Sequence, residues 1–120
     1  MKRYLRLHRP DGTRLPLRVR RCDTFWCRLR GLMFRRELPS DEGLLFVESG
    51  ESRMLTTIHM LFVFFPIGVV WMAADGRVVD MVVARPFRLR YTPHAPAKYY
   101  LEGPPALVEW VEPGERLTIE

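Results

Sequence analysis

Two strand-forming segments on either side of a tight turn constrain the fold of this chain more than any other feature. Residues 67–72 and 77–83 are rich in β-branched and aromatic side chains, and Asp75-Gly76 lies between them. Such side chains favour strands, and an Asp-Gly pair favours a hairpin turn. The pattern predicts an antiparallel hairpin, and therefore a fold organised around a β-sheet.

A second hairpin is predicted near the beginning of the chain. Residues 4–8 and 15–20 alternate apolar and polar side chains around the turn residues Pro10-Asp11-Gly12. Alternation with a period of two places one face of each strand in the core. The residues expected to point inward are Leu5, Leu7, Leu15, Leu17 and Val19.

One short helix is predicted at residues 25–30. Phe25, Trp26 and Leu29 lie three and four positions apart, Asp23 or Thr24 can cap the first turn, and Gly31 stands where a helix ends. Elsewhere, residues 44–47, 98–102 and 116–119 are expected to be strands, 48–52 a polar loop and 54–60 extended, while 61–65 and 107–111 are ambiguous.

The fold class follows from the predicted elements, which are many short strands and one clear helix without a regular alternation of strands and helices. We expect a mainly β (α+β) fold, an antiparallel, partly closed, barrel-like sheet with one or two short helices. A chain of 120 residues fits a single domain, residues 1–120.

The chain lacks the apolar run of roughly 18–20 residues that spans a bilayer, and its charged beginning is not followed by the apolar stretch of a signal peptide. We therefore expect a cytoplasmic protein with no membrane partner. In that compartment Cys22 and Cys27 are expected to be buried free thiols. A disulfide between them is geometrically possible, but it is not the expectation. A zinc site would need further ligands at recognisable spacing, so no metal and no cofactor are predicted.

Basic residues concentrate in the first third of the chain. Residues 1–36 hold twelve Lys and Arg against two Asp, a balance of +10, whereas residues 37–120 have a balance of −5. A basic region of this kind is compatible with binding to nucleic acid. However, 17 of the 19 basic residues are arginine, and alternating arginines are also typical of the solvated face of a sheet. We expect the second explanation to hold.

Several short motifs occur in an order that resembles a known family. They are Arg30-Gly31-Leu32-Met33-Phe34-Arg35, Leu38-Pro39, Glu42-Gly43-Leu44-Leu45-Phe46, Thr57-Ile58-His59-Met60, Phe65-Pro66-Ile67, Val69-Val70, Asp75-Gly76-Arg77-Val78 and Tyr99-Tyr100-Leu101-Glu102. Over about residues 14–120 the chain resembles the family catalogued as domain of unknown function 192. The resemblance implies a small β-rich domain of bacteria and archaea, with no established reaction. It also implies an acidic residue directly after Pro66-Ile67, where this chain has Gly68.

The candidate ligand-binding residues are His59, Arg30, Gly31, Met60 and Thr57. His59 is the only histidine in the apolar middle of the chain, and an imidazole buried there needs a hydrogen bond, a metal or a cavity. It can bind an anionic ligand together with Arg30 or Arg53, or it can be structural, bonded to a backbone carbonyl and to the hydroxyl of Thr56 or Thr57. The structural role is favoured.

The sequence thus predicts a non-enzymatic module that binds an unidentified small molecule or protein between the His59 segment and the Arg30-Gly31 turn. One alternative is an enzyme, for example a hydrolase, that uses His59 as a general base. Cys27 could pair with His59 as a nucleophile, although nothing in the local sequence favours it. Another alternative is a nucleic-acid-binding accessory that uses the basic first third. Aromatic residues could form a base-stacking surface, but they are expected to be core instead: Trp26, Trp71, Trp110, Phe62, Phe64 and Phe65.

Overall fold

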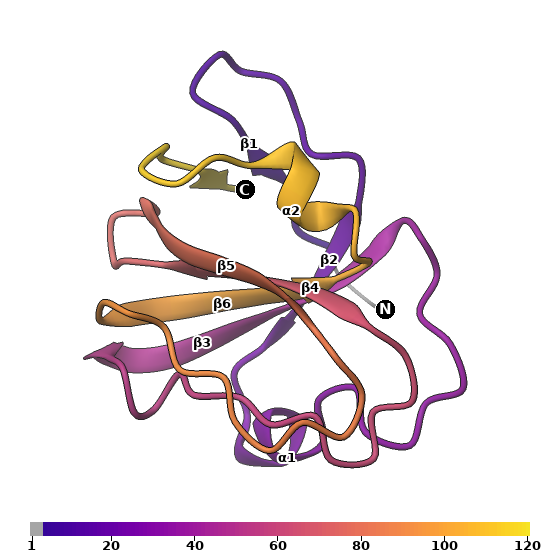
Figure 1. Cartoon of the computed structure of the whole chain (residues 1–120). Helices are drawn as coiled ribbons and strands as arrows, with labels where there is room; N and C mark the ends of the chain where they lie inside the picture. Colours follow the sequence, from indigo (N-terminus) through magenta and orange to yellow (C-terminus); the bar gives the residue numbers. More distant parts are fainter. Residues whose placement is uncertain (1–3) are drawn as a thin grey trace.

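An open five-stranded sheet forms the middle of the protein (Figure 1). The computed structural model describes residues 4–120, so the first part of the charged beginning lies outside the described residues. The strand order is β2-β3-β6-β4-β5, and only the pair β2 and β3 is parallel. The strands are β2 (Arg18–Cys22), β3 (Glu42–Ser52), β4 (Ile67–Met72), β5 (Val78–Ala84) and β6 (Ala97–Gly103).

Each face of the sheet packs against its own hydrophobic cluster, because successive side chains of a strand point to opposite faces. On one face, α2 (Leu107–Trp110) and a small sheet of β1 (Leu7–His8) and β7 (Thr118–Ile119) close the core. On the other face, α1 (Phe25–Arg30) and the long loops cover the sheet (Figure 1). In β4, for example, Val69 belongs to the α1 side and Val70 to the α2 side.

The mainly β, mostly antiparallel fold predicted from the sequence is confirmed, but the sheet is open rather than barrel-like. The β4–β5 hairpin is present, with a bulge between Trp71 and Met72. Helix α1 spans the predicted residues and is capped by the Thr24 side chain, which accepts from the Cys27 N–H. The ambiguous residues near 107 form the short helix α2. Among residues 4–120, no helix is long and apolar enough to cross a membrane.

Predictions that depended on distant pairing were partly wrong. The two halves of the expected first hairpin are joined by single bridges, Leu5 to Val19 and His8 to Arg14, but their longer pairings are β1 with β7 and β2 with β3. Residues 48–52 are not a loop, since β3 continues through them to pair Ser52 with Ala97. Residues 54–60 form turns with one bridge at Ile58, and residues 61–65 are neither helix nor strand.

Three aromatic residues expected in the core are exposed. Trp26, Phe62 and Phe64 have 74%, 45% and 51% of their surface accessible, whereas Trp71 is buried with 1% accessible. The first three lie on α1 and on the loop before β4, which cover the α1 side of the sheet. Side chains of these covering segments that face away from the sheet have no further layer to pack against.

The expectation of free thiols is wrong, because Cys22 and Cys27 form a disulfide. Their Cα atoms lie 5.5 Å apart, within the usual range for this bond. The bond joins the end of β2 to the middle of α1. It therefore holds a six-residue helix that contributes no fully buried residue of its own. A helix this short does not form stably without such tertiary support.

Replacing both cysteines by serine should lower the free energy of unfolding by about 2 kcal/mol, since the bond closes a short loop in the unfolded chain. Urea denaturation of the oxidised wild type and of the double variant measures the difference. A control with Thr24→Ser keeps the helix cap and should remain close to wild type. Equal stabilities of wild type and double variant, or alkylation of both thiols in unreduced protein, would contradict the disulfide.

Candidate functional site

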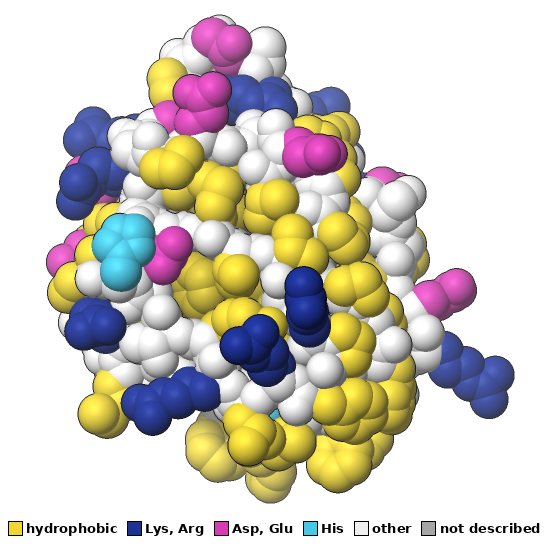
Figure 2. Space-filling view, in the orientation of Figure 1, with side chains coloured by type: hydrophobic (Ala, Val, Ile, Leu, Met, Phe, Trp, Pro, Cys, Tyr) yellow, Lys and Arg dark blue, Asp and Glu magenta, His cyan; other side chains and the backbone are white. Residues whose placement is uncertain are grey.

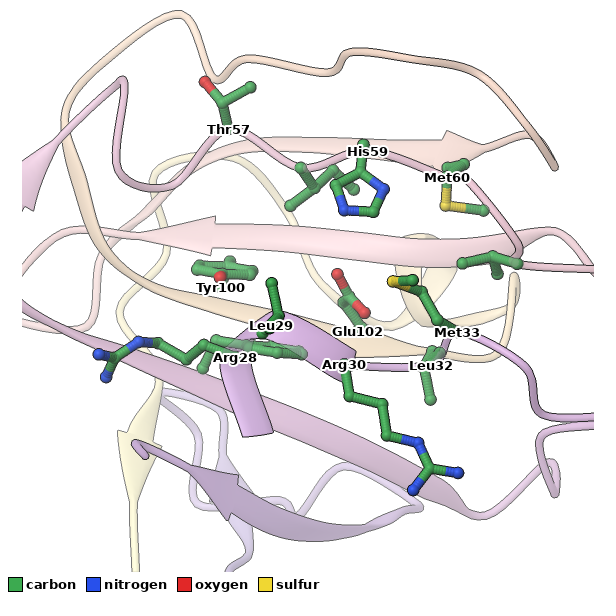
Figure 3. Close-up of a pocket in the computed structure, with 14 residues that line it drawn as sticks. Arg28, Leu29, Arg30, Leu32, Met33, Thr57, His59, Met60, Tyr100 and Glu102 are labelled. Atoms are coloured by element: carbon green, nitrogen blue, oxygen red, sulfur yellow. The ribbon is translucent and has the colours of Figure 1, made fainter. Parts of the chain in front are cut away.

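A cavity of about 70 Å³ lies between the end of α1, the loop before β4 and the α1 side of the sheet (Figure 3). We call it the α1 cavity. All five residues that the sequence singled out line it: Arg30, Gly31, Thr57, His59 and Met60. The structure thus brings together two motifs that lie almost thirty positions apart in the chain. Phe46 and Tyr100, stacked with ring centroids 4.6 Å apart, border it on the sheet side.

Gly31 closes α1 and allows the chain to approach the sheet. Its N–H donates to the Cys27 carbonyl at 2.8 Å, and its φ of +49° is one that residues with a side chain rarely adopt. A Cβ at this position would lie 3.4 Å from the Phe46 ring. Arg30 adds its backbone and stem to the cavity wall, while its guanidinium extends away from Glu102 and His59 (Figure 3).

The opposite wall is held by hydrogen bonds to two other parts of the chain. The Trp71 indole N–H donates to the Thr56 carbonyl at 2.7 Å, and the Met60 N–H donates to the Arg88 carbonyl at 2.7 Å. The Thr57 hydroxyl donates to the Arg53 carbonyl at 3.0 Å and also lies 3.0 Å from the Thr92 hydroxyl. These contacts fix the backbone on both sides of His59.

His59 is exposed, so the expectation of an imidazole in the core is wrong. Its neighbours Ile58 and Met60 are buried, and the histidine turns outward between them to line the cavity. Nor does its ring bond to a carbonyl or a threonine hydroxyl: Nδ1 accepts the N–H of Leu61 at 3.2 Å. With Nδ1 accepting, a neutral ring carries its proton on Nε2, which leaves Nε2 free to meet a ligand.

Glu102 is the site residue that the sequence prediction missed. It lies on β6 two positions after Tyr100, on the same face of the sheet, and its carboxyl points into the α1 cavity toward His59 (Figure 3). Only 7% of the residue is accessible. Burial raises the pKa of the Glu102 carboxyl from its ordinary value of 4.5 to about 8, and within residues 4–120 no hydrogen bond or cation offsets this effect.

The rest of the wall is mixed, with apolar side chains beside Arg28, Arg30, Thr57 and Tyr100. Burial is also the main cause that raises the pKa of the Tyr100 hydroxyl, with the nearby Glu102 charge as a second cause. Met33 lies beside Glu102, and Met60 lies on the opposite wall next to His59 (Figure 3). The cavity therefore offers one acidic group and one imidazole in a wall of mixed polarity.

The pairing of His59 with a cysteine nucleophile loses its support. Cys27 cannot act as a nucleophile with His59 while it is bonded to Cys22. Among residues 4–120, no group of three or more His, Cys, Asp or Glu side chains is arranged to hold a metal ion.

Gly68 lies on the other face of the sheet from the α1 cavity. It pairs with Gly103, and a Cβ built on it would lie 2.7 Å from the Pro104 carbonyl oxygen and 2.9 Å from the Leu107 Cβ, on the α2 side. An acidic side chain at this position would point toward α2 and not toward His59. The departure from the family pattern at Gly68 therefore removes no partner of His59.

Comparisons with known proteins agree with the resemblance in the sequence. The chain matches the family DUF192, described as Uncharacterized ACR, over residues 6–119. It is similar to a UPF0127 protein of Thermococcus kodakarensis, with 40% identity over 79% of this chain and 59% of that protein. It is also similar to a UPF0127 protein of Pyrococcus furiosus, with 39% identity over 88% of this chain and 90% of that protein. The chain thus spans less than two thirds of the first relative.

Two crystal structures share the fold. One, from Sinorhizobium meliloti 1021 and described as a proposed transcription regulator, has a TM-score of 0.82 and 26% identity, with 98% of this chain and 93% of that chain covered. The other, a protein of unknown function from Novosphingobium aromaticivorans, has a TM-score of 0.78 and 24% identity, with 96% and 83% covered.

The stability of the protein should fall between pH 4.5 and about 8 because of Glu102. In this interval the unfolded carboxyl ionises while the folded one stays protonated, so the contribution of Glu102 is complete below pH 4.5 and is lost as the pH rises through its folded pKa. The loss is on the order of 5 kcal/mol at full ionisation. Urea denaturation across this range should show the decline in wild type and a much flatter profile in Glu102→Gln.

The exposed Glu109 on α2 provides the matched control for that measurement. Glu109→Gln should retain the pH dependence of wild type. A profile for Glu102→Gln that follows wild type would show that the Glu102 carboxyl is not the group responsible.

Gly68→Ala should lower the free energy of unfolding by about 1–3 kcal/mol, the usual effect of overpacking a tight site. Gly50→Ala is the matched control, since a Cβ at Gly50 would have no atom within 4 Å. Thermal and urea unfolding of both variants measure the effect. If Gly68→Ala is as stable as Gly50→Ala, the packing of α2 against β4 is looser than described.

Proposed function

We propose a function from the α1 cavity, because the DUF192 family to which this chain belongs is uncharacterised. The chain is a non-enzymatic binding module, and the cavity takes the amine end of a small ligand, held as an alkylammonium by Glu102. The observation that carries this proposal is the Glu102 carboxyl itself, buried, lining the cavity and not hydrogen-bonded within the described residues.

The position of Glu102 supports a donor ligand. Its carboxyl is largely buried but open to the cavity, and a hydrogen bond to a charged group contributes about 1.5–3 kcal/mol. An ammonium group supplies up to three N–H donors and the opposite charge. It would bind the ionised form of Glu102, so binding below about pH 8 must release a proton from that carboxyl.

The size and lining of the cavity restrict the ligand further. A volume of about 70 Å³ is roughly half that of an engineered 150 Å³ protein cavity that accepts benzene, so only a terminal group enters. The carbon next to the amine would lie among Phe46, Tyr100 and Met60. The remainder of a longer ligand would extend past His59, whose Nε2 can meet a polar group there.

Binding rather than catalysis is supported by the state of the possible nucleophiles. Of the lining residues, only Thr57 and Tyr100 carry hydroxyl groups. The Thr57 hydroxyl is occupied by Arg53 and Thr92, and the raised pKa of Tyr100 keeps its hydroxyl protonated. An enzyme that uses His59 as base would have to activate a group brought by the substrate.

Ethylammonium should bind at the α1 cavity and shift the backbone amide signals of Gly31, His59 and Met60 in a ¹H–¹⁵N NMR titration. Glu102→Gln should bind ethylammonium with at least tenfold lower affinity, while Glu109→Gln should bind it as wild type does. Acetate, matched in size but of opposite charge, should leave these signals in place. If Glu102→Gln binds ethylammonium as well as wild type, or acetate shifts the same signals, the proposal is wrong.

The affinity for ethylammonium should rise about tenfold per pH unit below about pH 8 and then level off, because a proton leaves Glu102 on binding. The same titration at several pH values measures this slope. A flat profile would mean that the ligand meets a carboxyl whose protonation does not change.

A further inference from the structure

One end of the molecule is both apolar and basic. Three segments, residues 24–36, 53–66 and 84–96, meet at the α1 end, which is at the bottom of Figure 1. We call them together the aromatic end. They hold eleven of the twelve large hydrophobic residues that are exposed in residues 4–120. These are Phe25, Trp26, Leu29, Phe34, Met54, Leu55, Leu61, Phe62, Phe64, Phe87 and Leu89.

The charge of the aromatic end is of one sign. The three segments contain eight arginines and no aspartate or glutamate, although the whole chain has 14 acidic residues. Figure 2 shows hydrophobic side chains gathered along the lower edge of the molecule, with basic side chains close above them. The arginines are Arg28, Arg30, Arg35, Arg36, Arg53, Arg85, Arg88 and Arg90.

Strained backbone holds part of this surface in place. Phe34, Phe62 and Phe87 are the non-glycine residues with positive φ in residues 4–120, at 65°, 58° and 64°. Bulky side chains rarely adopt such angles, and they persist where the surroundings impose them. The Phe34 N–H donates to the Phe62 carbonyl at 2.9 Å, and the rings of these two residues are stacked with centroids 5.0 Å apart. These contacts hold the Phe34 and Phe62 rings against each other at the surface, with 57% and 45% of each residue accessible.

A groove beside the aromatic end is suited to a phosphate group. It measures about 430 Å³ and is lined by Arg20, Arg30, Arg35 and the exposed Trp26. Arg35 also lies 4.0 Å from the Glu42 carboxylate. One carboxylate cannot neutralise three guanidinium groups, so the groove keeps a positive charge. Arginine forks bind phosphate oxygens in pairs of hydrogen bonds.

We propose that the aromatic end docks on the surface of a lipid bilayer that contains anionic lipids. Phenylalanine, leucine and methionine side chains would enter the boundary between headgroups and acyl chains, and the arginines would lie at the level of the lipid phosphates. The three segments carry only positive charge, because they contain arginines and no acidic residues. They therefore complement a negatively charged surface. This proposal does not depend on the proposed function of the α1 cavity.

The composition of the surface favours a bilayer over single-stranded nucleic acid. Bases stack on aromatic faces that are separately accessible. Here Phe34 and Phe62 stack on each other, and Phe87 contacts Phe62 and Phe64 at ring-centroid distances of 6.5 and 5.7 Å. Leucine and methionine offer no stacking face, whereas both enter a bilayer surface readily. The sequence predicted no membrane partner from the lack of a spanning segment, and peripheral docking needs none.

The test is flotation of the purified chain with vesicles of phosphatidylcholine alone and of phosphatidylcholine mixed equally with phosphatidylglycerol. Wild type should bind the mixed vesicles, bind the neutral ones at least tenfold more weakly, and dissociate as salt is added. Two double variants should each bind the mixed vesicles at least tenfold more weakly than wild type: Phe62→Ser/Phe87→Ser and Arg85→Ser/Arg90→Ser. The matched controls Val83→Ser and Arg77→Ser change exposed residues outside the three segments and should bind as wild type.

Tryptophan fluorescence keeps the test decisive if a double variant fails to fold. Mixed vesicles should shift the emission of wild type to shorter wavelength. Trp26→Phe should remove that shift, because Trp71 is buried with 1% of its surface accessible and Trp110 lies on the α2 side. Absence of binding to mixed vesicles would overturn the proposal. So would equal losses in the Val83 control, or salt-sensitive binding of a single-stranded oligonucleotide by a protein that ignores vesicles.

Discussion

The pairing of β6 with both β3 and β4 is the constraint on which the rest of this structure depends. β6 lies at the centre of the sheet, with Leu101 opposite Leu45 on one side and Val70 on the other. This register decides which side chains enter each core, because a shift of one residue would exchange the two faces. It puts Leu101 under α2 and places Tyr100 and Glu102 under α1. The candidate site is thus a consequence of the sheet register before any loop is considered.

Local signals in the sequence were sufficient for local elements. The β4–β5 hairpin was predicted from Asp75-Gly76, and α1 from its cap and Gly31, because each is determined by neighbouring residues. The parallel pairing of β2 with β3 and the pairing of β1 with β7 involve residues far apart, and no pattern within either segment specifies them. Whether the sheet closes into a barrel or stays open depends on those distant pairings. Strand patterns alone therefore could not test the barrel-like expectation.

The candidate residues predicted from the sequence meet at one cavity, but the chemistry of that cavity was not predicted. His59, Gly31 and Met60 do line one cavity, yet the argument that led to His59 assumed burial that the structure does not show. Glu102 was missed because a single acidic residue at the end of an apolar strand is usually exposed. Its signal was present in Tyr100-Leu101-Glu102, where alternation places Glu102 on the same face of the strand as Tyr100. The disulfide was missed because an assumed compartment was given more weight than a spacing that permits the bond.

The two faces of the sheet differ in how they are closed, and this difference explains where function can reside. On the α2 side Leu7, Leu15 and Leu17 are fully buried, and the covering elements are themselves paired strands and a packed helix. On the α1 side the cover is a helix without a buried residue, tied down by a disulfide and by the hydrogen bonds of Arg28 to the Asp23 and Val47 carbonyls. Apolar side chains on such a cover cannot all reach the core, so they remain at the surface. The α1 side therefore combines a buried core with a cavity and an exposed aromatic end.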